Sequence, residues 1–198
     1  MPTMQNALRY GFMLGCLLVA VAVSASAQAP QAAQQATGHD GQHDFDWEFG
    51  RWRTQVRRLL NPLSGQQEWA EYDGTSVVLP LMDGRANLVE LRVEGPAGRI
   101  HGTSLRLYNP QTRQWSLNYA SLKNGLLTRP QFGGFQGGRG EFYSLEELDG
   151  RAVLVRFVIS EVGRDSARFE QAFSADGGKT WETNWIAIDT RLPDKAAD

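Results

Sequence analysis

Arginine and aromatic side chains at strand spacing are the groups in this sequence best suited to small-molecule chemistry. Residues two positions apart lie on one face of a β-strand, so Arg106 shares a face with Tyr108, and Trp115 shares one with Tyr119. Turned toward an interior, such faces would give a cavity with aromatic walls and a few polar groups that orient a ligand. The residues expected to line it are Arg106, Tyr108, Trp115, Tyr119, Arg156 and Trp185.

The arginines determine which ligand this cavity would accept. An inward arginine favours a carboxylate, a phenolate or another anionic group. Arg156 lies between Val155 and Phe157, in a segment that is apolar on both faces. The alternative for each arginine is an outward position, paired with an acid or lying over a tryptophan ring. In the last strand, alternation places Trp181 on the same face as Trp185.

Motifs for metal or nucleophilic catalysis do not occur at recognisable spacing in this sequence. His39 and His43 stand four residues apart, but nothing nearby would order their segment, which favours a solvated polar tail. His101 is the only histidine among the predicted strands and is expected on a surface face, although it could act as a lone acid–base group. We therefore expect no metal and no cofactor. An enzyme would have to use tyrosine, arginine, aspartate or glutamate.

Period-two alternation of apolar residues begins after Phe45 and predicts an all-β domain. Short connections between the segments make neighbouring strands antiparallel. A meander of about ten such strands closes most simply into an antiparallel up-and-down β-barrel, which leaves no exposed edge. A barrel of that size has an interior larger than its side chains fill. The predicted strands are residues 51–60, 67–79, 86–94, 99–108, 114–122, 126–132, 139–147, 151–161, 165–174 and 179–191.

Two glycine-containing segments interrupt the alternation. Five glycines within residues 133–140 predict a mobile hairpin or a flap at the cavity, because the strand-to-helix context of a phosphate-binding loop is missing. Residues 174–181 match S-x-D-x-G-x-T-W, which looks like the Asp-box of sialidases and related propellers. One copy in a domain of this size favours a turn, in which Asp176 accepts backbone N–H groups.

The predicted domain begins with a G-x-W motif, Gly50-Arg51-Trp52, which resembles the motif at the start of lipocalin and calycin barrels. In those barrels the glycine permits the bend into the first strand and the tryptophan plugs the closed end. The wider pattern H-D-F-D-x-x-x-G-x-W, with residues 106–115 and 174–182, resembles an uncharacterised bacterial family of secreted lipocalin-like proteins. The resemblance covers about residues 43–191. It implies a calycin-type barrel and no particular activity.

The first residues of the chain are typical of a signal peptide. Arg9 precedes the apolar run 11–23, and Ala25-Ser26-Ala27 has the A-x-A pattern of a cleavage site. An uncleaved anchor and lipidation at Cys16 are the alternatives. After cleavage we expect no membrane span and a periplasmic or secreted protein. The expected organisation is a signal peptide at 1–27, a flexible linker at 28–42, the barrel at 43–192 and a C-terminal tail at 193–198.

Composition restricts the partners of the protein. The 198 residues include 20 Lys+Arg against 22 Asp+Glu, so no basic excess exists for a nucleic acid. The expected partner is a small hydrophobic or aromatic molecule, and a homodimer is left open. The leading hypothesis is an exported barrel that binds an apolar or aromatic ligand, and a ligand with an anionic group is one variant of it. The alternatives are a cofactor-free lyase, isomerase or cyclase in the same cavity, and a structural module with a filled core.

Overall fold

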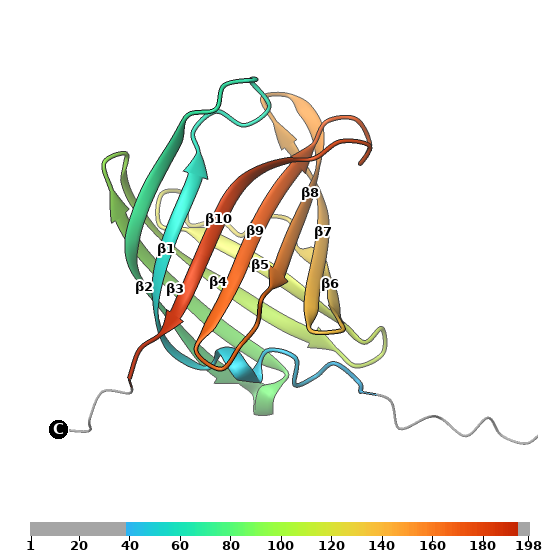
Figure 1. The fold of residues 1–198 in the computed structure, drawn as a ribbon. Coiled ribbons are helices and arrows are strands. Elements are labelled where there is room, and N and C mark those ends of the chain that lie inside the picture. Colours follow the sequence, from blue (N-terminus) through green and yellow to red (C-terminus); the bar gives the residue numbers. More distant parts are fainter. Residues whose placement is uncertain (1–38, 194–198) are drawn as a thin grey trace, which may run out of the picture. The chain divides into compact units, whose positions relative to one another are not determined.

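Ten antiparallel strands form a closed up-and-down β-barrel in the computed structural model, which describes residues 39–193 (Figure 1). Each strand pairs with its neighbours in sequence, and β1 pairs with β10 to close the barrel. The prediction of an all-β, up-and-down barrel is confirmed. The strands are β1 (Gly50–Leu59), β2 (Trp69–Leu81), β3 (Ala86–Gly95), β4 (Gly98–Asn109), β5 (Gln114–Ser121), β6 (Gln131–Gln136), β7 (Arg139–Leu148), β8 (Arg151–Ser160), β9 (Ser166–Ser174) and β10 (Glu182–Arg191).

Alternation along each strand decides which side chains enter the barrel. On β1, Trp52, Thr54 and Val56 are buried, whereas Arg53 and Gln55 are exposed. Burying the apolar set removes its surface from water, and a slip of one residue would expose that whole set. The hydrophobic pattern therefore fixes the register of the strands, and with it the positions of the interior polar groups.

One end of the barrel is closed by the segment that precedes β1. This segment holds the 3-10 helix η1 (Asp46–Glu48), which lies at the lower end of the barrel in Figure 1. Trp52 is fully buried at this end, where its Nε1 donates a hydrogen bond to the Glu48 carbonyl oxygen at 2.6 Å. The Arg191 guanidinium lies 4.0 Å from the centroid of the Trp52 ring. Trp52 thus plugs the closed end, as the G-x-W motif implied.

The end of the expected linker, residues 39–42, is bound to the barrel. The Tyr108 hydroxyl donates to the carbonyl oxygen of Asp40, and Trp115 Nε1 donates to that of Gly41 at 2.8 Å. Buried donors need acceptors, and this segment supplies them for two inward aromatic residues. The predicted signal peptide, the rest of the linker and most of the predicted tail lie outside the described residues.

Strand β6 begins later than the predicted strand 126–132. Residues 122–130 form a loop instead, and β6 starts at Gln131, directly after Pro130. Proline has no N–H to contribute to a ladder, so regular pairing begins after it. Only three residue pairs join β5 to β6, whereas ten join β1 to β2.

The glycines of residues 133–140 form a hairpin, and two of them lie within β6. A Cβ at Gly133 would overlap the carbonyl oxygen of Glu141 on β7, so only glycine permits this approach of the two strands. The connecting turn is made by Gly137 and Gly138, which both have positive φ angles. These glycines therefore allow the close approach of β6 to β7 and the tight turn that joins them.

The last hairpin combines a predicted turn with an unpredicted bulge. Asp176 Oδ1 accepts the N–H groups of Lys179 and Thr180 at 3.0 and 2.9 Å, which confirms the turn-forming role. Bonds from Thr180, by its N–H and its hydroxyl, are the largest causes that lower the pKa of Asp176 to about 2. The register of β10 against β9 then shifts between Thr183 and Trp185.

The bulge changes which tryptophans share a face. The inserted residue of β10 reverses the alternation on its two sides. Trp185 lines the interior, whereas Trp181 packs against Tyr143 and Arg156, which lie on the outer side of β7 and β8. The expectation that Trp181 and Trp185 share a face is therefore wrong. No helix among residues 39–193 is long and apolar enough to cross a membrane.

Candidate functional site

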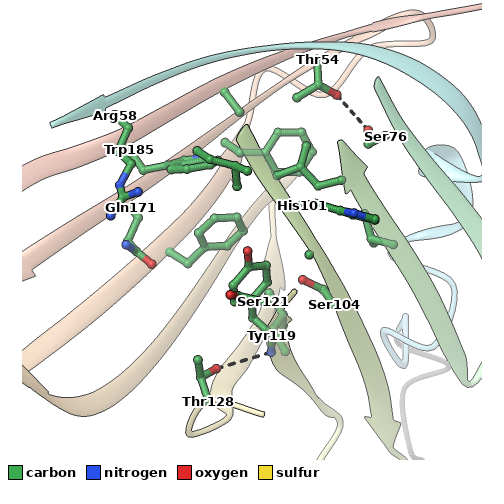
Figure 2. A pocket seen from close by; sticks show the side chains of 18 of the residues that line it. Thr54, Arg58, Ser76, His101, Ser104, Tyr119, Ser121, Thr128, Gln171 and Trp185 are labelled. Carbon is green, nitrogen blue, oxygen red and sulfur yellow. Dashed lines mark hydrogen bonds between the residues drawn. The ribbon is translucent and has the colours of Figure 1, made fainter. Parts of the chain in front are cut away.

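A cavity of about 720 Å³ occupies the interior of the barrel. It runs from a floor next to η1 to a mouth at the opposite end, and Figure 2 shows Tyr119, Gln171 and Trp185 entering it from three strands. This volume suits one drug-sized molecule. The floor is lined by Glu48, Thr54, Ser76, Arg106 and Asp189, the walls by Tyr72, Leu91, Leu117, Tyr119, Phe157, Phe169 and Trp185, and the mouth by Arg58, Arg99, Lys123 and Glu146.

Three of the six predicted lining residues face this cavity. Arg106 lies on the floor, and Tyr119 and Trp185 form part of the walls. Tyr108 and Trp115 belong to the core beneath the floor, where their polar atoms hold residues 39–42. Alternation predicts that these five side chains point into the barrel. It gives the face of a strand residue but not its depth along the barrel axis.

Arg156 lies outside the cavity. Its guanidinium carbon stands 4.5 Å from the centroid of the Trp181 ring, which is the outward alternative considered for an arginine among apolar neighbours. The long apolar stem of arginine covers hydrophobic surface while its charged end reaches the periphery. The apolar residues around Arg156 therefore reflect packing on the outer face of β8.

The charge of Arg106 is already neutralised at the cavity floor. Its two terminal nitrogens, Nη1 and Nη2, donate to the two carboxylate oxygens of Glu48, and the Nη2–Oε1 distance is 3.2 Å. Both side chains are at least 95% buried, and the guanidinium also lies 4.4 Å from the centroid of the Phe45 ring. A buried charge is stable only when it is paired. Arg106 is consequently not free to bind an anionic ligand group.

Asp189 is the second carboxyl group of the floor and forms no ion pair with a cation among the described residues. It is 4% exposed. Ser76 Oγ donates to its Oδ2 at 3.2 Å, and Thr54 Oγ1 lies 2.9 Å from Ser76 Oγ, which makes a short chain of hydroxyls (Figure 2). Burial, reinforced by the negative charge of Glu48, outweighs the hydrogen bonds from Thr54 and Ser76 and raises the pKa of Asp189 to about 7.

Two buried polar atoms of the floor have no hydrogen-bond partner among the described residues. They are Asp189 Oδ1 and Arg106 Nε. Buried polar atoms are paired in the great majority of cases, and an unpaired one costs about 1–3 kcal/mol. Both residues line the cavity, so a small shift of either side chain would bring an unpaired polar atom to a ligand at the floor.

The middle of the cavity is aromatic. The Tyr119 ring lies against Gly102, where any Cβ would collide with the phenol, so the absence of a side chain on β4 creates the seat of this ring. Burial raises the pKa of Tyr119 above its ordinary value, and the phenol therefore stays protonated at neutral pH. Gln171 Nε2 donates to Asn184 Oδ1 at 3.0 Å beside Trp185. This zone can pack against a flat or apolar molecule.

The mouth carries positive charge, although Arg99 lies 3.8 Å from the carboxylate of Glu94. Arg58, Arg99 and Lys123 line it, together with one carboxylate, that of Glu146. An anionic group would find attraction here, in contact with solvent, and not at the balanced floor. The expected preference for an anionic ligand therefore moves from Arg106 to the rim.

Sequence reasoning missed Glu48 and Asp189 as site residues. Glu48 precedes the first strand, so period-two spacing gives no information about it. Asp189 does share a face with Trp185 and Ala187 by alternation, and an acid on an otherwise inward apolar face is the signal that could have found it.

The histidines lie away from this floor. His39 pairs with Asp44, and His43 Nδ1 lies 2.8 Å from Asp46 Oδ2. His101, expected on a surface face, is among the residues that line the cavity (Figure 2), and its Nε2 lies 2.9 Å from the Glu90 carboxylate. Within residues 39–193, no three histidine, cysteine, aspartate or glutamate side chains are grouped so that they could hold a metal ion.

Comparison with known proteins finds a likeness of fold only. No family model and no curated protein matches this sequence. An S-type phycobiliprotein lyase, CPES from Guillardia theta, superposes with a TM-score of 0.52 at 11% sequence identity, over 76% of this chain and 92% of that chain. The chain therefore has the barrel fold of that lyase, which is lipocalin-like.

Designed barrels are also similar at lower scores. The protein EF1p2_mFAP2b bound to DFHBI has a TM-score of 0.43 at 8% identity and covers 77% of this chain and 99% of that chain. The redesigned barrel mFAP0, also bound to DFHBI, has a TM-score of 0.42 at 10% identity, over 73% of this chain and 99% of that chain.

Proposed function

We propose that this protein is an exported barrel that binds one small apolar or aromatic molecule in its interior. The observation that carries the proposal is the cavity of about 720 Å³ with aromatic walls, polar groups at its floor and a charged rim. Pockets for small molecules have this composition. The unfilled interior disfavours a purely structural module.

The ligand enters through the mouth and its apolar body lies between Tyr119, Phe157 and Trp185. A carboxylate or another anionic group, where the ligand has one, stays at the rim near Arg58 and Lys123. Export rests on the signal-peptide pattern of residues 1–27, and it places the protein in the periplasm or outside the cell. Membership of the secreted bacterial lipocalin-like family is part of the same proposal.

Native mass spectrometry of gently purified protein tests the binding function. We expect a retained small molecule, and thermal shifts with a panel of apolar aromatic compounds. Ser104→Phe should abolish both results, because Ser104 lines the cavity and the larger ring would occupy it. Leu105→Phe, one position along on the opposite face of β4, is the matched control and should leave binding unchanged. A ligand-free mass and no thermal shift would refute the proposal.

A cofactor-free lyase, isomerase or cyclase is the second candidate, and Asp189 favours it. A carboxyl group with a pKa of about 7 inside a cavity can both donate and accept a proton at neutral pH. Asp189 and Tyr119 would then be the acid–base groups. Under this function the compound recovered after incubation differs in structure from the compound added, whereas a binding protein returns it unchanged.

A further inference from the structure

We propose that the cavity floor binds an uncharged carbonyl-type oxygen of the ligand, with Asp189 donating the hydrogen bond and Arg106 Nε completing the site. The inference rests on the proposed binding function and adds the chemical class of the buried end of the ligand. It is carried by two side chains that are each 4% exposed, that both line the cavity and that each hold a polar atom without a partner among residues 39–193.

The hydrogen bonds already formed assign the direction of the missing one. When the Ser76 hydroxyl donates to Asp189 Oδ2, that oxygen acts as an acceptor. A protonated carboxyl group carries its hydrogen on the other oxygen, Oδ1, and this is the atom left without a partner. Arg106 Nε is a donor in every ionisation state. The floor therefore has two hydrogen-bond donors, Asp189 Oδ1 and Arg106 Nε, and a ligand atom bound there would have to be an acceptor.

The surroundings of Asp189 favour the protonated form. The charged groups that act on it are Glu48 of η1 and Arg106 of β4, and these neutralise each other. The strands beside it offer only hydroxyls, from Thr54 and Ser76, and the small apolar side chain of Ala167 on β9. A carboxylate there would be desolvated next to another carboxylate, and its pKa is raised accordingly.

The same charge balance selects a neutral acceptor. An anionic ligand oxygen at the floor would face Glu48, while Arg106, the cation of the described chain that lines the floor, is already paired with Glu48. A ketone, ester, amide or protonated acid brings an acceptor without a charge to desolvate. The ligand thus has its carbonyl oxygen at the floor, an apolar or aromatic middle, and any anionic group at the rim.

A matched pair of probes tests this assignment on the full chain. Fluorene and 9-fluorenone share one ring system and differ by the carbonyl group, and their affinities can be measured by calorimetry at about pH 6. We expect fluorenone to bind about tenfold more tightly or better, as for an acceptor that relieves a buried donor. Equal affinities would overturn the inference and leave the proposed function intact. Binding of neither compound, together with a ligand-free mass and no thermal shift across the panel of aromatic compounds, would overturn both.

Variants identify the donor. Asp189→Leu should remove the preference for fluorenone, and Asp189→Asn should keep it, because the amide still donates. Asp73→Asn, in an exposed ion pair with Arg53 away from the cavity, is the control and should change nothing. In the unmodified protein the preference should fall as the pH rises above about 7, whereas in Asp189→Asn it should stay constant. A preference that does not depend on pH in the unmodified protein would show that Asp189 is not the donor.

Discussion

Asp189 couples the stability of the barrel to pH. Its pKa in the folded protein is about 7, above the ordinary value of 3.8. Between these two values the folded chain holds a proton that the unfolded chain has released, so the free energy of unfolding falls as the pH rises through this window. We expect the protein to be less stable near pH 8 than near pH 5, by on the order of a few kcal/mol.

Urea unfolding at several pH values measures this dependence. Asp189→Asn should be the more stable protein near pH 8 and should lose most of the pH dependence, because an amide has no charge to desolvate. Asp73→Asn is a suitable control, since Asp73 pairs with Arg53 at the exposed surface. A stability that rises steadily from pH 5 to pH 8 would contradict the assignment.

Individual residues of the floor show what the sequence could and could not predict. Alternation places Arg106 correctly inside, because the face of a strand residue is a local property. Its ionic partner, Glu48, lies outside the strands and 58 residues away, and no local spacing connects the two. The neutralised charge of Arg106 is therefore a property of the folded barrel, and the anionic preference inferred from the residue alone moves to the mouth.

At the scale of elements, turns and strands were predictable where the signal is local. Asp176 and its glycines specify a hairpin through short-range hydrogen bonds. The late start of β6 and the bulge in β10 depend on how each strand meets its neighbour. The role of Gly133 could not be predicted locally. Its spacing predicts a mobile hairpin or flap, but the structure needs a glycine there because a Cβ would overlap the carbonyl oxygen of Glu141 on β7.

Gly133→Ala should disrupt the β6–β7 pair. The new Cβ would overlap the carbonyl oxygen of Glu141, which is backbone and cannot rotate away, so we expect a destabilisation of about 2 kcal/mol or more. Gly134→Ala is the matched control, because its Cβ would meet only the Arg113 carbonyl oxygen, at 3.8 Å. Thermal unfolding compares the two. Equal melting temperatures of the two variants would show that β6 can shift away from β7 without a loss of stability, and would contradict the prediction.

The whole barrel has one weak seam, between β5 and β6. The pair of β1 with β2 runs for ten residues, but this pair has three. The loop 122–130 that follows is joined to β5 by one isolated bridge, between Ala120 and Leu127. Leu122, Leu126 and Leu127 of this loop are each at least 60% exposed, and Leu122, Lys123 and Thr128 line the cavity. A ligand that enters the barrel therefore passes beside the part of the wall with the fewest interstrand hydrogen bonds.

Hydrogen exchange monitored by mass spectrometry should locate this seam. Amides at 118–130 should exchange at least about tenfold faster than those of β1 and β2, because local opening requires the loss of few hydrogen bonds there. A bound aromatic ligand should slow exchange at 118–130 while leaving the outer hairpin of residues 174–181 unchanged, since the ligand contacts Tyr119 and not that turn. Uniform protection around the barrel, or slowing confined to the hairpin at 174–181, would place the entrance elsewhere.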